Sequence, residues 1–101
     1  MQNIINYHFF EKLCALPFID AIFLYGSRAR GDHKERSDID LAIVCPSATS
    51  DDWLTVLDII EDADTLLKID CVRFDELTDQ ELLKENILRD KIILYAKAKE
   101  Q

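Results

Sequence analysis

One stretch decides how this chain folds: residues 24–42, which read LYGSRARGDHKERSDIDLA. The stretch begins inside an apolar run typical of a β-strand, and that run breaks at Gly26-Ser27. Ten residues follow, most of them charged, and Asp38-x-Asp40 then opens a second apolar run. The spacing predicts a strand, a tight turn, a loop and a second strand, with polar side chains gathered at one edge of a sheet.

The two aspartates of this stretch form a candidate metal-binding pair. Side chains alternate along a strand, so Asp38 and Asp40 point to the same face of the predicted sheet. Two like charges on one face repel each other, and each is stabilised by water or by a cation. Mg²⁺ suits such a pair because it takes few protein carboxylates and completes its shell with water and substrate phosphate. The alternative is a solvated strand start with no ligand.

A third acidic residue, Asp70, interrupts the apolar run of residues 68–74. If this run pairs as a strand beside residues 38–44, Asp70 lies on the same face as the aspartate pair. Buried carboxylates are rare unless they are paired or metal-bound, and three together suit two metal ions bridged by carboxylates. Asp70 could then also accept the proton of an attacking hydroxyl. The alternative is a surface-facing strand residue.

The Gly-Ser break has the features of a phosphate-binding turn. Gly26 lets a ligand approach the backbone without a Cβ in the way. Ser27 supplies a hydroxyl and can cap a short helix over residues 27–31, whose free N–H groups attract anions. Arg28 and Arg30 add positive charge, but residues two apart do not share a helix face, so we expect only one to reach the phosphates. The alternative is a plain strand–turn–helix with solvated arginines.

The remaining chain alternates between helical and strand patterns. Apolar residues at spacings of three and four predict helices, and short runs rich in β-formers predict strands. The predicted helices cover residues 3–16, 50–67 and 78–88, and the predicted strands cover residues 19–25, 38–44 and 68–74. Residues 92–95 fit either a fourth strand or a continuation of the last helix. We therefore predict an α/β (α+β) fold, a small mixed sheet of about four strands flanked by helices.

Capping residues and the chain length complete this outline. Ser50 or Asp51 can cap the long helix, and Thr78 with Glu81 three residues later fits a capping box. The 101 residues are enough for one domain, so we expect a single domain over residues 1–101. The last residues, 97–101, are expected to fray.

The net charge of the chain limits the kinds of partner that it can bind. Twelve basic and twenty acidic residues give a net charge of −8. Nucleic-acid-binding surfaces are usually basic, so direct binding of a polynucleotide is disfavoured, as is binding to an acidic membrane surface. The apolar runs are far shorter than the roughly 20 residues that a membrane span needs, and the first residues lack the pattern of a signal peptide. A small anion held through a divalent cation is compatible with this charge.

The three cysteines carry little chemical information. Cys14, Cys45 and Cys71 are too few and too scattered for a zinc site, and an odd number does not suit a disulfide framework. We expect buried, reduced thiols in a cytoplasmic protein. The charged segment 33–36 is interpreted as a solvated loop, with contact to a partner protein as the alternative.

Gly26-Ser27, ten further residues and Asp38-x-Asp40 together match the signature of the DNA polymerase β-like nucleotidyltransferase superfamily. The wider stretch 24–42 resembles its minimal nucleotidyltransferase (MNT) branch, and the resemblance covers roughly residues 15–95. It implies a polymerase β-like palm fold that binds ATP with Mg²⁺. It also implies that Asp38 and Asp40 are metal ligands and that Asp70 is the third carboxylate.

The resemblance also suggests a partner. MNT proteins similar to this chain act as antitoxins beside HEPN-domain toxins and transfer AMP from ATP to a toxin tyrosine. Larger members of the superfamily carry a second domain that grips the acceptor, so a single small domain implies an acceptor brought by another chain. Two other functions stay open: an idle binding module that neutralises a partner by contact, and a nucleotidyltransferase acting on a small molecule or RNA. The oligomeric state is open as well.

The charge argument makes one prediction about stability. Clustered carboxylates without metal repel one another in the folded state. The substitution Asp38→Asn should therefore leave the metal-free stability unchanged or raise it, while removing transfer.

Overall fold

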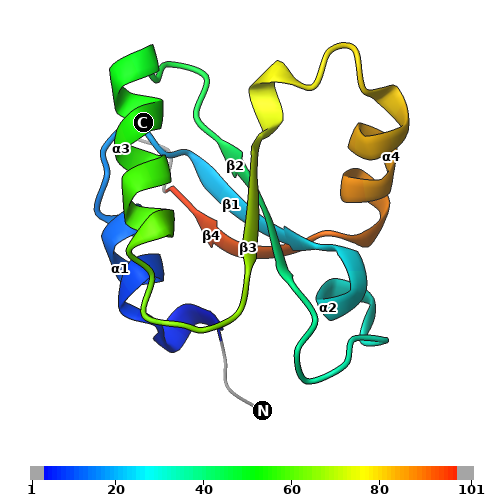
Figure 1. The fold of residues 1–101 in the computed structure, drawn as a ribbon. Coiled ribbons are helices and arrows are strands. Elements are labelled where there is room, and N and C mark those ends of the chain that lie inside the picture. The colour runs from blue at the N-terminus through cyan, green and yellow to red at the C-terminus, as the bar shows by residue number, and fades with distance from the viewer. Residues whose placement is uncertain (1–3, 98–101) are drawn as a thin grey trace.

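The computed structural model describes residues 4–97 as four strands and their connecting helices (Figure 1). The strands are β1 (Ala21–Tyr25), β2 (Ile39–Val44), β3 (Ile69–Arg73) and β4 (Ile92–Ala96). The α-helices are α1 (His8–Cys14), α2 (Gly26–Arg30), α3 (Ser50–Glu61) and α4 (Glu81–Asp90), and the 3₁₀ turns are η1 (Ile4–Asn6) and η2 (Phe74–Glu76). None of these helices is both long and apolar enough to span a bilayer.

The four strands form one mixed sheet in the order β3-β2-β1-β4. Strand β1 runs antiparallel to both β2 and β4, whereas β2 and β3 are parallel. Helices α1 and α3 lie on one side of the sheet, and α2 and α4 lie on the other (Figure 1). The predicted mixed sheet with flanking helices is confirmed, and the ambiguous run 92–95 is part of strand β4.

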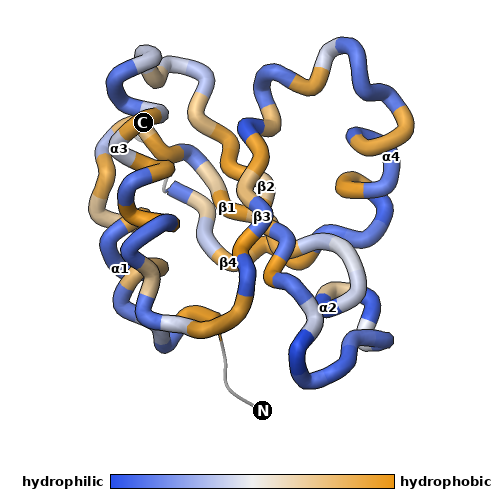
Figure 2. Tube along the Cα trace, viewed as in Figure 1, coloured by the Kyte–Doolittle hydropathy of each residue, from blue (hydrophilic) through white to orange (hydrophobic). Residues whose placement is uncertain are grey.

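The larger core lies between the sheet and helices α1 and α3. It forms because alternate residues of the two central strands are apolar and point to this face. Figure 2 shows the apolar residues concentrated on the inner strands and on the helix sides that face them. The fully buried members include Phe9, Leu13, Ile22, Leu41 and Val56.

The opposite face of the sheet is only partly covered. A small core of Phe23, Ala42, Leu77 and Ile87 packs the sheet against α4 and the segment that precedes it. Beyond this core, toward α2, the same face carries polar side chains. The incomplete cover leaves that end of the face accessible, and the candidate site lies there.

The N-terminal helix is shorter than predicted. The turn η1 and helix α1 are separated by Tyr7, which has an extended backbone (φ −78°, ψ 146°). The first free N–H groups of α1, those of His8 and Phe9, donate to the two carboxylate oxygens of Asp64 at 2.9 and 3.0 Å. A carboxylate remote in sequence thus caps this helix. Asn3, the predicted start, lies outside the described residues.

The helix predicted over residues 50–67 ends at Glu61, so α3 is also shorter than predicted. Acidic residues crowd this end, and negative charge opposes the partial negative charge of a helix C-terminus. One of these residues, Asp64, caps α1 instead of extending α3. The following segment is therefore free to cross back toward β3.

Three capping predictions were wrong. Helix α3 is capped by Thr49 in a capping box with Asp52, one residue before the predicted Ser50 or Asp51. Helix α4 begins after Gln80 without a side-chain cap, so Thr78 and Glu81 do not form the expected box. Ser27 lies inside α2 and does not cap it, because the helix begins at Gly26.

The predicted terminal fraying concerns residues 97–101, of which only the first is described. Lys97 donates its backbone N–H to the carbonyl of Asp20 at 2.7 Å and its Nζ to the carbonyl of Pro17 at 2.8 Å. Lys97 is therefore held against the loop before β1, contrary to prediction. Residues 98–101 lie outside the described part of the chain.

The cysteines are free thiols, but they are not equally buried. Cys45 is fully buried, while Cys14 and Cys71 are partly buried. The expectation of unpaired thiols is confirmed for these three residues, and the expectation of full burial holds for one of them.

Candidate active site

The turn from β1 into α2 brings the backbone close to one carboxylate. Gly26 has a left-handed φ of +73°, a conformation that side-chain-bearing residues rarely adopt. A Cβ placed on Gly26 would clash with Oδ2 of Asp40 and would lie 3.2 Å from its Cγ. Tyr25 pairs with Asp40 in the register of β1 and β2, which fixes this approach. The glycine therefore leaves room for the carboxylate to lie against the turn.

Asp40 and Asp70 are direct neighbours across parallel strands β2 and β3. Paired residues of adjacent strands point to the same face, so both carboxylates lie on the partly covered face. Burial raises the pKa of Asp40, and the charges of Asp70 and Asp38 raise it further. The raised pKa of Asp40 thus reflects its burial first and the two neighbouring negative charges second.

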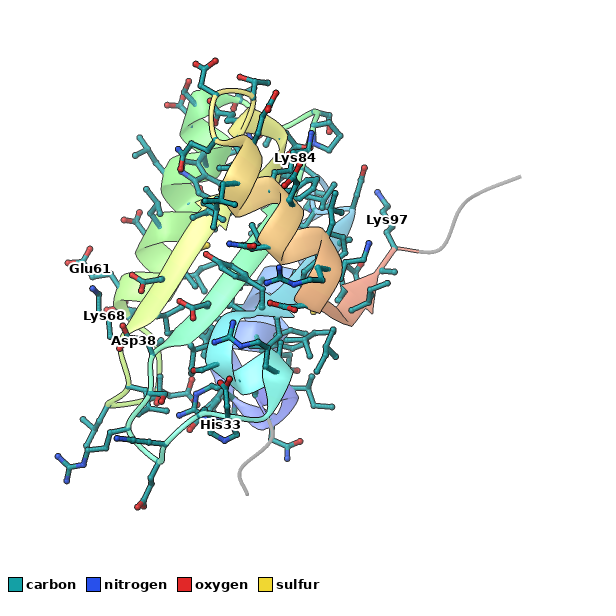
Figure 3. The ribbon with its side chains drawn as sticks, turned by 90° about the vertical axis from the view of Figure 1, so that its right-hand side faces the viewer. His33, Asp38, Glu61, Lys68, Lys84 and Lys97 are labelled. Atoms are coloured by element: carbon teal, nitrogen blue, oxygen red, sulfur yellow. The ribbon has the colours of Figure 1, made fainter. Side chains whose placement is uncertain are left out.

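Asp38 lies one residue before β2 and joins this cluster at its rim. It points to the same side as Asp40 by strand alternation. Figure 3 shows Asp38 and Lys68 at the same end of the sheet, where the backbone N–H of Ile39 donates to the carbonyl of Lys68 at 2.9 Å. The Nζ of Lys68 lies 3.5 Å from Oδ1 of Asp70. That ion pair is solvent-exposed, so it contributes little and can exchange for another cation.

The fit of this cluster to a divalent cation depends on its donors. Within residues 4–97, no three His, Cys, Asp or Glu side chains converge into a complete metal-binding group. Mg²⁺ does not need one, because it is usually bound by one or two carboxylates together with substrate phosphates. Asp40 and Asp70 supply such a pair of oxygen donors, and Asp38 supplies a third nearby. The donor set therefore fits a divalent cation such as Mg²⁺ that is also bound by substrate phosphates.

The two arginines of α2 have different partners. Nε and Nη2 of Arg28 donate to the carbonyl of Ser37 at 3.1 and 2.9 Å, and Nη2 also donates to the carbonyl of Glu35 at 3.1 Å. Arg30 instead pairs with Asp32 at 3.1 Å and with Asp90 at 3.5 Å. Of the two arginines, Arg30 is the one whose charge lowers the pKa of Asp40.

Two residues near the cluster were not among the predicted site residues. Tyr25 shares a sheet face with Asp40 and Asp70, and burial, followed by these two charges, raises the pKa of its phenol to about 12. Asp90, at the end of α4, is 11% exposed and binds both Arg30 and Arg89. Sequence spacing carries no signal for Asp90, because its contact with Arg30 joins helices that are distant in the chain.

The charged loop 33–36 precedes Asp38 by two residues and is exposed for most of its length. Lys34, Glu35 and Arg36 are exposed, while His33 is partly buried. With the segment 64–67, this loop lines a cavity of about 540 Å³ whose walls contain none of the three aspartates. The cavity adjoins the candidate site, because Arg28 and Ile39 also line it.

The structure combines a mixed sheet with a Gly-Ser turn that lies beside carboxylates on two neighbouring strands. This combination is typical of the palm domains of nucleotidyltransferases. The chain belongs to the family described as "Polymerase beta, Nucleotidyltransferase", which matches residues 9–100. A search of curated proteins finds no significant match.

Solved structures with the same fold include toxin–antitoxin assemblies. One, a toxin–antitoxin with AMP-PNP, has a TM-score of 0.63 and 18% identity, over 81% of this chain and 64% of that one. Two mutant forms of the toxin–antitoxin MntA–HpeT each have a TM-score of 0.59, and each match covers 64% of that chain. One mutant is 17% identical over 81% of this chain, and the other is 20% identical over 82% of it. The chain thus spans 64% of the length of these neighbours. At such low identity the likeness shows the fold.

Proposed function

We propose that this protein is a Mg²⁺-dependent nucleotidyltransferase that transfers AMP from ATP to a hydroxyl of a partner protein, most simply a tyrosine. The observation that carries the proposal is the pairing of Asp40 with Asp70, with Gly26 packed against Asp40. Phosphoryl and nucleotidyl transfer depend mainly on positioning and charge neutralisation. Carboxylates beside an open turn meet both needs, and the chain belongs to a nucleotidyltransferase family.

The proposed reaction exchanges a phosphoanhydride bond of ATP for a phosphate ester bond to the acceptor. The acceptor oxygen attacks the α-phosphorus of ATP, the bond from that phosphorus to the β-phosphate oxygen breaks, and pyrophosphate leaves with the electron pair. Asp70 accepts the hydroxyl proton, and Asp38 and Asp40 would hold the cation beside the nucleotide. Mg²⁺ would supply charge neutralisation at the phosphates and is held, in this proposal, by Asp38, Asp40 and Asp70.

The turn and α2 hold the phosphates in this proposal. Gly26 and Ser27 offer backbone N–H groups and a hydroxyl close to Asp40, so the triphosphate lies between the turn and the carboxylates. Arg30 provides the positive charge, because its guanidinium is the one that acts on Asp40. Arg28 is engaged with loop carbonyls.

The partner in this proposal is a HEPN-type toxin, and the protein acts as its antitoxin. Support comes from the MNT-like motif at residues 24–42 and from structural neighbours that are toxin–antitoxin assemblies. Three unpaired cysteines are compatible with the reducing cytoplasm as the place of action.

The test is incubation of the purified protein with a HEPN-domain partner, Mg²⁺ and ATP labelled in the α-phosphate. The partner should gain the label on a tyrosine, and the Asp40→Asn variant should not transfer it. Absence of both transfer and Mg²⁺-dependent ATP binding in the wild-type protein would refute the proposal.

A second function, neutralisation of the partner by contact alone, is favoured by one observation. The three aspartates do not converge into a complete metal group within the described residues. In this case the Asp40→Asn variant would still neutralise the partner in a growth or ribonuclease assay. Loss of neutralisation by a folded Asp40→Asn protein supports catalysis instead.

A further inference from the structure

Arg28 connects helix α2 to the loop that carries Asp38. Its guanidinium makes three hydrogen bonds to two backbone carbonyls of this loop, those of Glu35 and Ser37. Two of the three, at 2.9 and 3.1 Å, go to the carbonyl of Ser37, which belongs to the peptide that links Ser37 to Asp38. The guanidinium therefore acts directly on the backbone that sets the position of Asp38.

The loop end that Arg28 binds is itself organised. The hydroxyl of Ser37 accepts the backbone N–H of Lys34 at 2.8 Å, and the backbone N–H of Ser37 donates to the carbonyl of Lys34 at 3.0 Å. These two bonds close a turn over residues 34–37. They turn the carbonyls of Glu35 and Ser37 toward α2, where one planar guanidinium can reach both.

Arginine is suited to this contact in a way that lysine is not. The guanidinium has donors fixed in a plane, so it can bridge two carbonyls at once, whereas an ammonium is a compact point charge on a flexible stem. Donors engaged in this way are also withdrawn from phosphate binding. Arg30 pairs instead with the side chains of Asp32 and Asp90, and its charge lowers the pKa of Asp40.

We propose that Arg28 is a positioning residue, which fixes Asp38 relative to the Gly26-Ser27 turn and does not bind the nucleotide itself. The inference rests on the proposed function, since Asp38 matters as a ligand of nucleotide-bound Mg²⁺. Arg28 makes the distance between the turn and Asp38 a fixed property of the fold. Without the Arg28 contact, the backbone at Asp38 would be flexible, and it would have to become ordered each time a metal–nucleotide complex binds.

The test compares Arg28→Lys, which keeps the charge but not the two-carbonyl contact, with Arg36→Lys, the same change at an exposed arginine of the same loop. Hydrogen–deuterium exchange without ligand reports on the loop. Electron paramagnetic resonance of Mn²⁺, titrated into protein with AMP-PNP, reports on the metal site. Transfer assays at varied Mg²⁺ and ATP give the two half-saturating concentrations separately.

For Arg28→Lys we expect faster amide exchange over residues 34–38. We also expect about tenfold weaker Mn²⁺ binding and a similar rise in half-saturating Mg²⁺, the order expected for one lost charge-assisted hydrogen bond. At saturating Mg²⁺, both kcat and the KM for ATP should return close to the wild-type values. Arg36→Lys should match the wild-type protein in all of these measurements.

Three results would overturn the inference: unchanged loop exchange in Arg28→Lys, unchanged Mn²⁺ affinity, or a raised KM for ATP that excess Mg²⁺ does not correct. The last would make Arg28 a phosphate ligand. Ser37→Ala gives a second route that leaves every charge in place, and it should shift exchange and Mn²⁺ affinity in the same direction by a smaller factor. If the wild-type protein binds no Mn²⁺ with AMP-PNP, the proposed function fails, and loop exchange still decides whether Arg28 holds the loop.

Discussion

Asp40 and Asp70 lie opposite each other on parallel strands, although thirty positions separate them in the chain. The parallel pairing is made possible by α3, which carries the chain from the end of β2 back to the start of β3. The charge of Asp70 is one of the causes that raise the pKa of Asp40. The pair is both the centre of the candidate site and a source of repulsion in the folded protein.

Replacement of Asp70 tests its proposed role as base and ligand. Asp70→Asn should lower kcat for AMP transfer by about two to four orders of magnitude, the usual contribution of a general base. The measurement is label transfer under single-turnover conditions. Lys68→Ala removes the exposed ion-pair partner of Asp70 and should leave kcat within about threefold, because exposed pairs contribute little. A larger effect for Lys68→Ala than for Asp70→Asn would contradict this assignment.

The charge on Asp40 should make the metal-free protein less stable as the pH rises. A carboxyl group whose folded-state pKa is raised above the ordinary 3.8 favours folding below that value, and the advantage is lost as the pH rises through the folded-state pKa. In EDTA at neutral pH, Asp40→Asn should therefore unfold at a higher urea concentration than the wild-type protein. The two curves should converge below pH 3.8. A less stable Asp40→Asn protein at neutral pH would indicate a structural role for the carboxylate.

The space beside Gly26 can be tested against a second glycine with the same kind of backbone. Gly26 and Gly31 both have positive φ, +73° and +86°, but a Cβ on Gly31 meets nothing within 4 Å. Gly31→Ala should cost about 1–2 kcal/mol of unfolding free energy from backbone strain alone. Gly26→Ala should cost more, because its Cβ also collides with Asp40, and it should abolish transfer. Equal costs in urea unfolding would show that the contact with Asp40 is easily relieved.

The remote cap of α1 gives a pH dependence of the opposite sign. The backbone N–H of His8 is the main cause that lowers the pKa of Asp64, and that of Phe9 adds to it. A lowered pKa means that the carboxylate stabilises the fold above the ordinary value of 3.8, and that this contribution is lost as the pH falls through the folded-state pKa. Asp64→Asn should lower the urea midpoint at neutral pH, and the difference should disappear in acid. Asp62→Asn is the charge-matched control and should not lower the midpoint, because Asp62 lies at the C-terminal end of α3, where negative charge is unfavourable.

Replacement of Arg30 tests which arginine faces the phosphates. Arg30→Gln should raise the KM for ATP about tenfold, since a charge-assisted contact with phosphate is lost, and excess Mg²⁺ should not restore it. Arg28→Lys is expected to respond to Mg²⁺ in the opposite way, so the two variants form a matched pair. The same KM for ATP in Arg30→Gln and wild-type protein would leave Arg30 as a link between α2 and Asp90 only.

Local patterns in the sequence predict much of the site. Gly26-Ser27 and Asp38-x-Asp40 can be placed on a turn and a strand start because glycine breaks, alternation and apolar runs act over a few residues. The shared face of Asp38 and Asp40 follows from the same local geometry. The position of Asp70 could only be stated conditionally, because strand pairing is a long-range property.

Where local sequence patterns predicted the structure wrongly, a contact with a distant residue or an unfavourable charge was the cause. Helix α3 ends early because acidic residues oppose its C-terminal dipole, and Asp64 binds α1 instead. The different fates of Arg28 and Arg30 also depend on distant partners, the loop before β2 and the end of α4. No spacing within α2 distinguishes the two arginines beyond placing them on different faces.

The sequence by itself determined the class of the fold and the chemistry available to it, because hydrophobic periodicity and the residue types at a turn are local properties. Only the tertiary structure decided which strand stands next to β2, and so brought Asp70 opposite Asp40. It also decided that Arg28 binds the loop before Asp38, while Arg30 pairs with Asp32 and Asp90. The physical reason is that strand order and side-chain partners depend on how the whole chain buries its apolar surface, which no segment specifies alone.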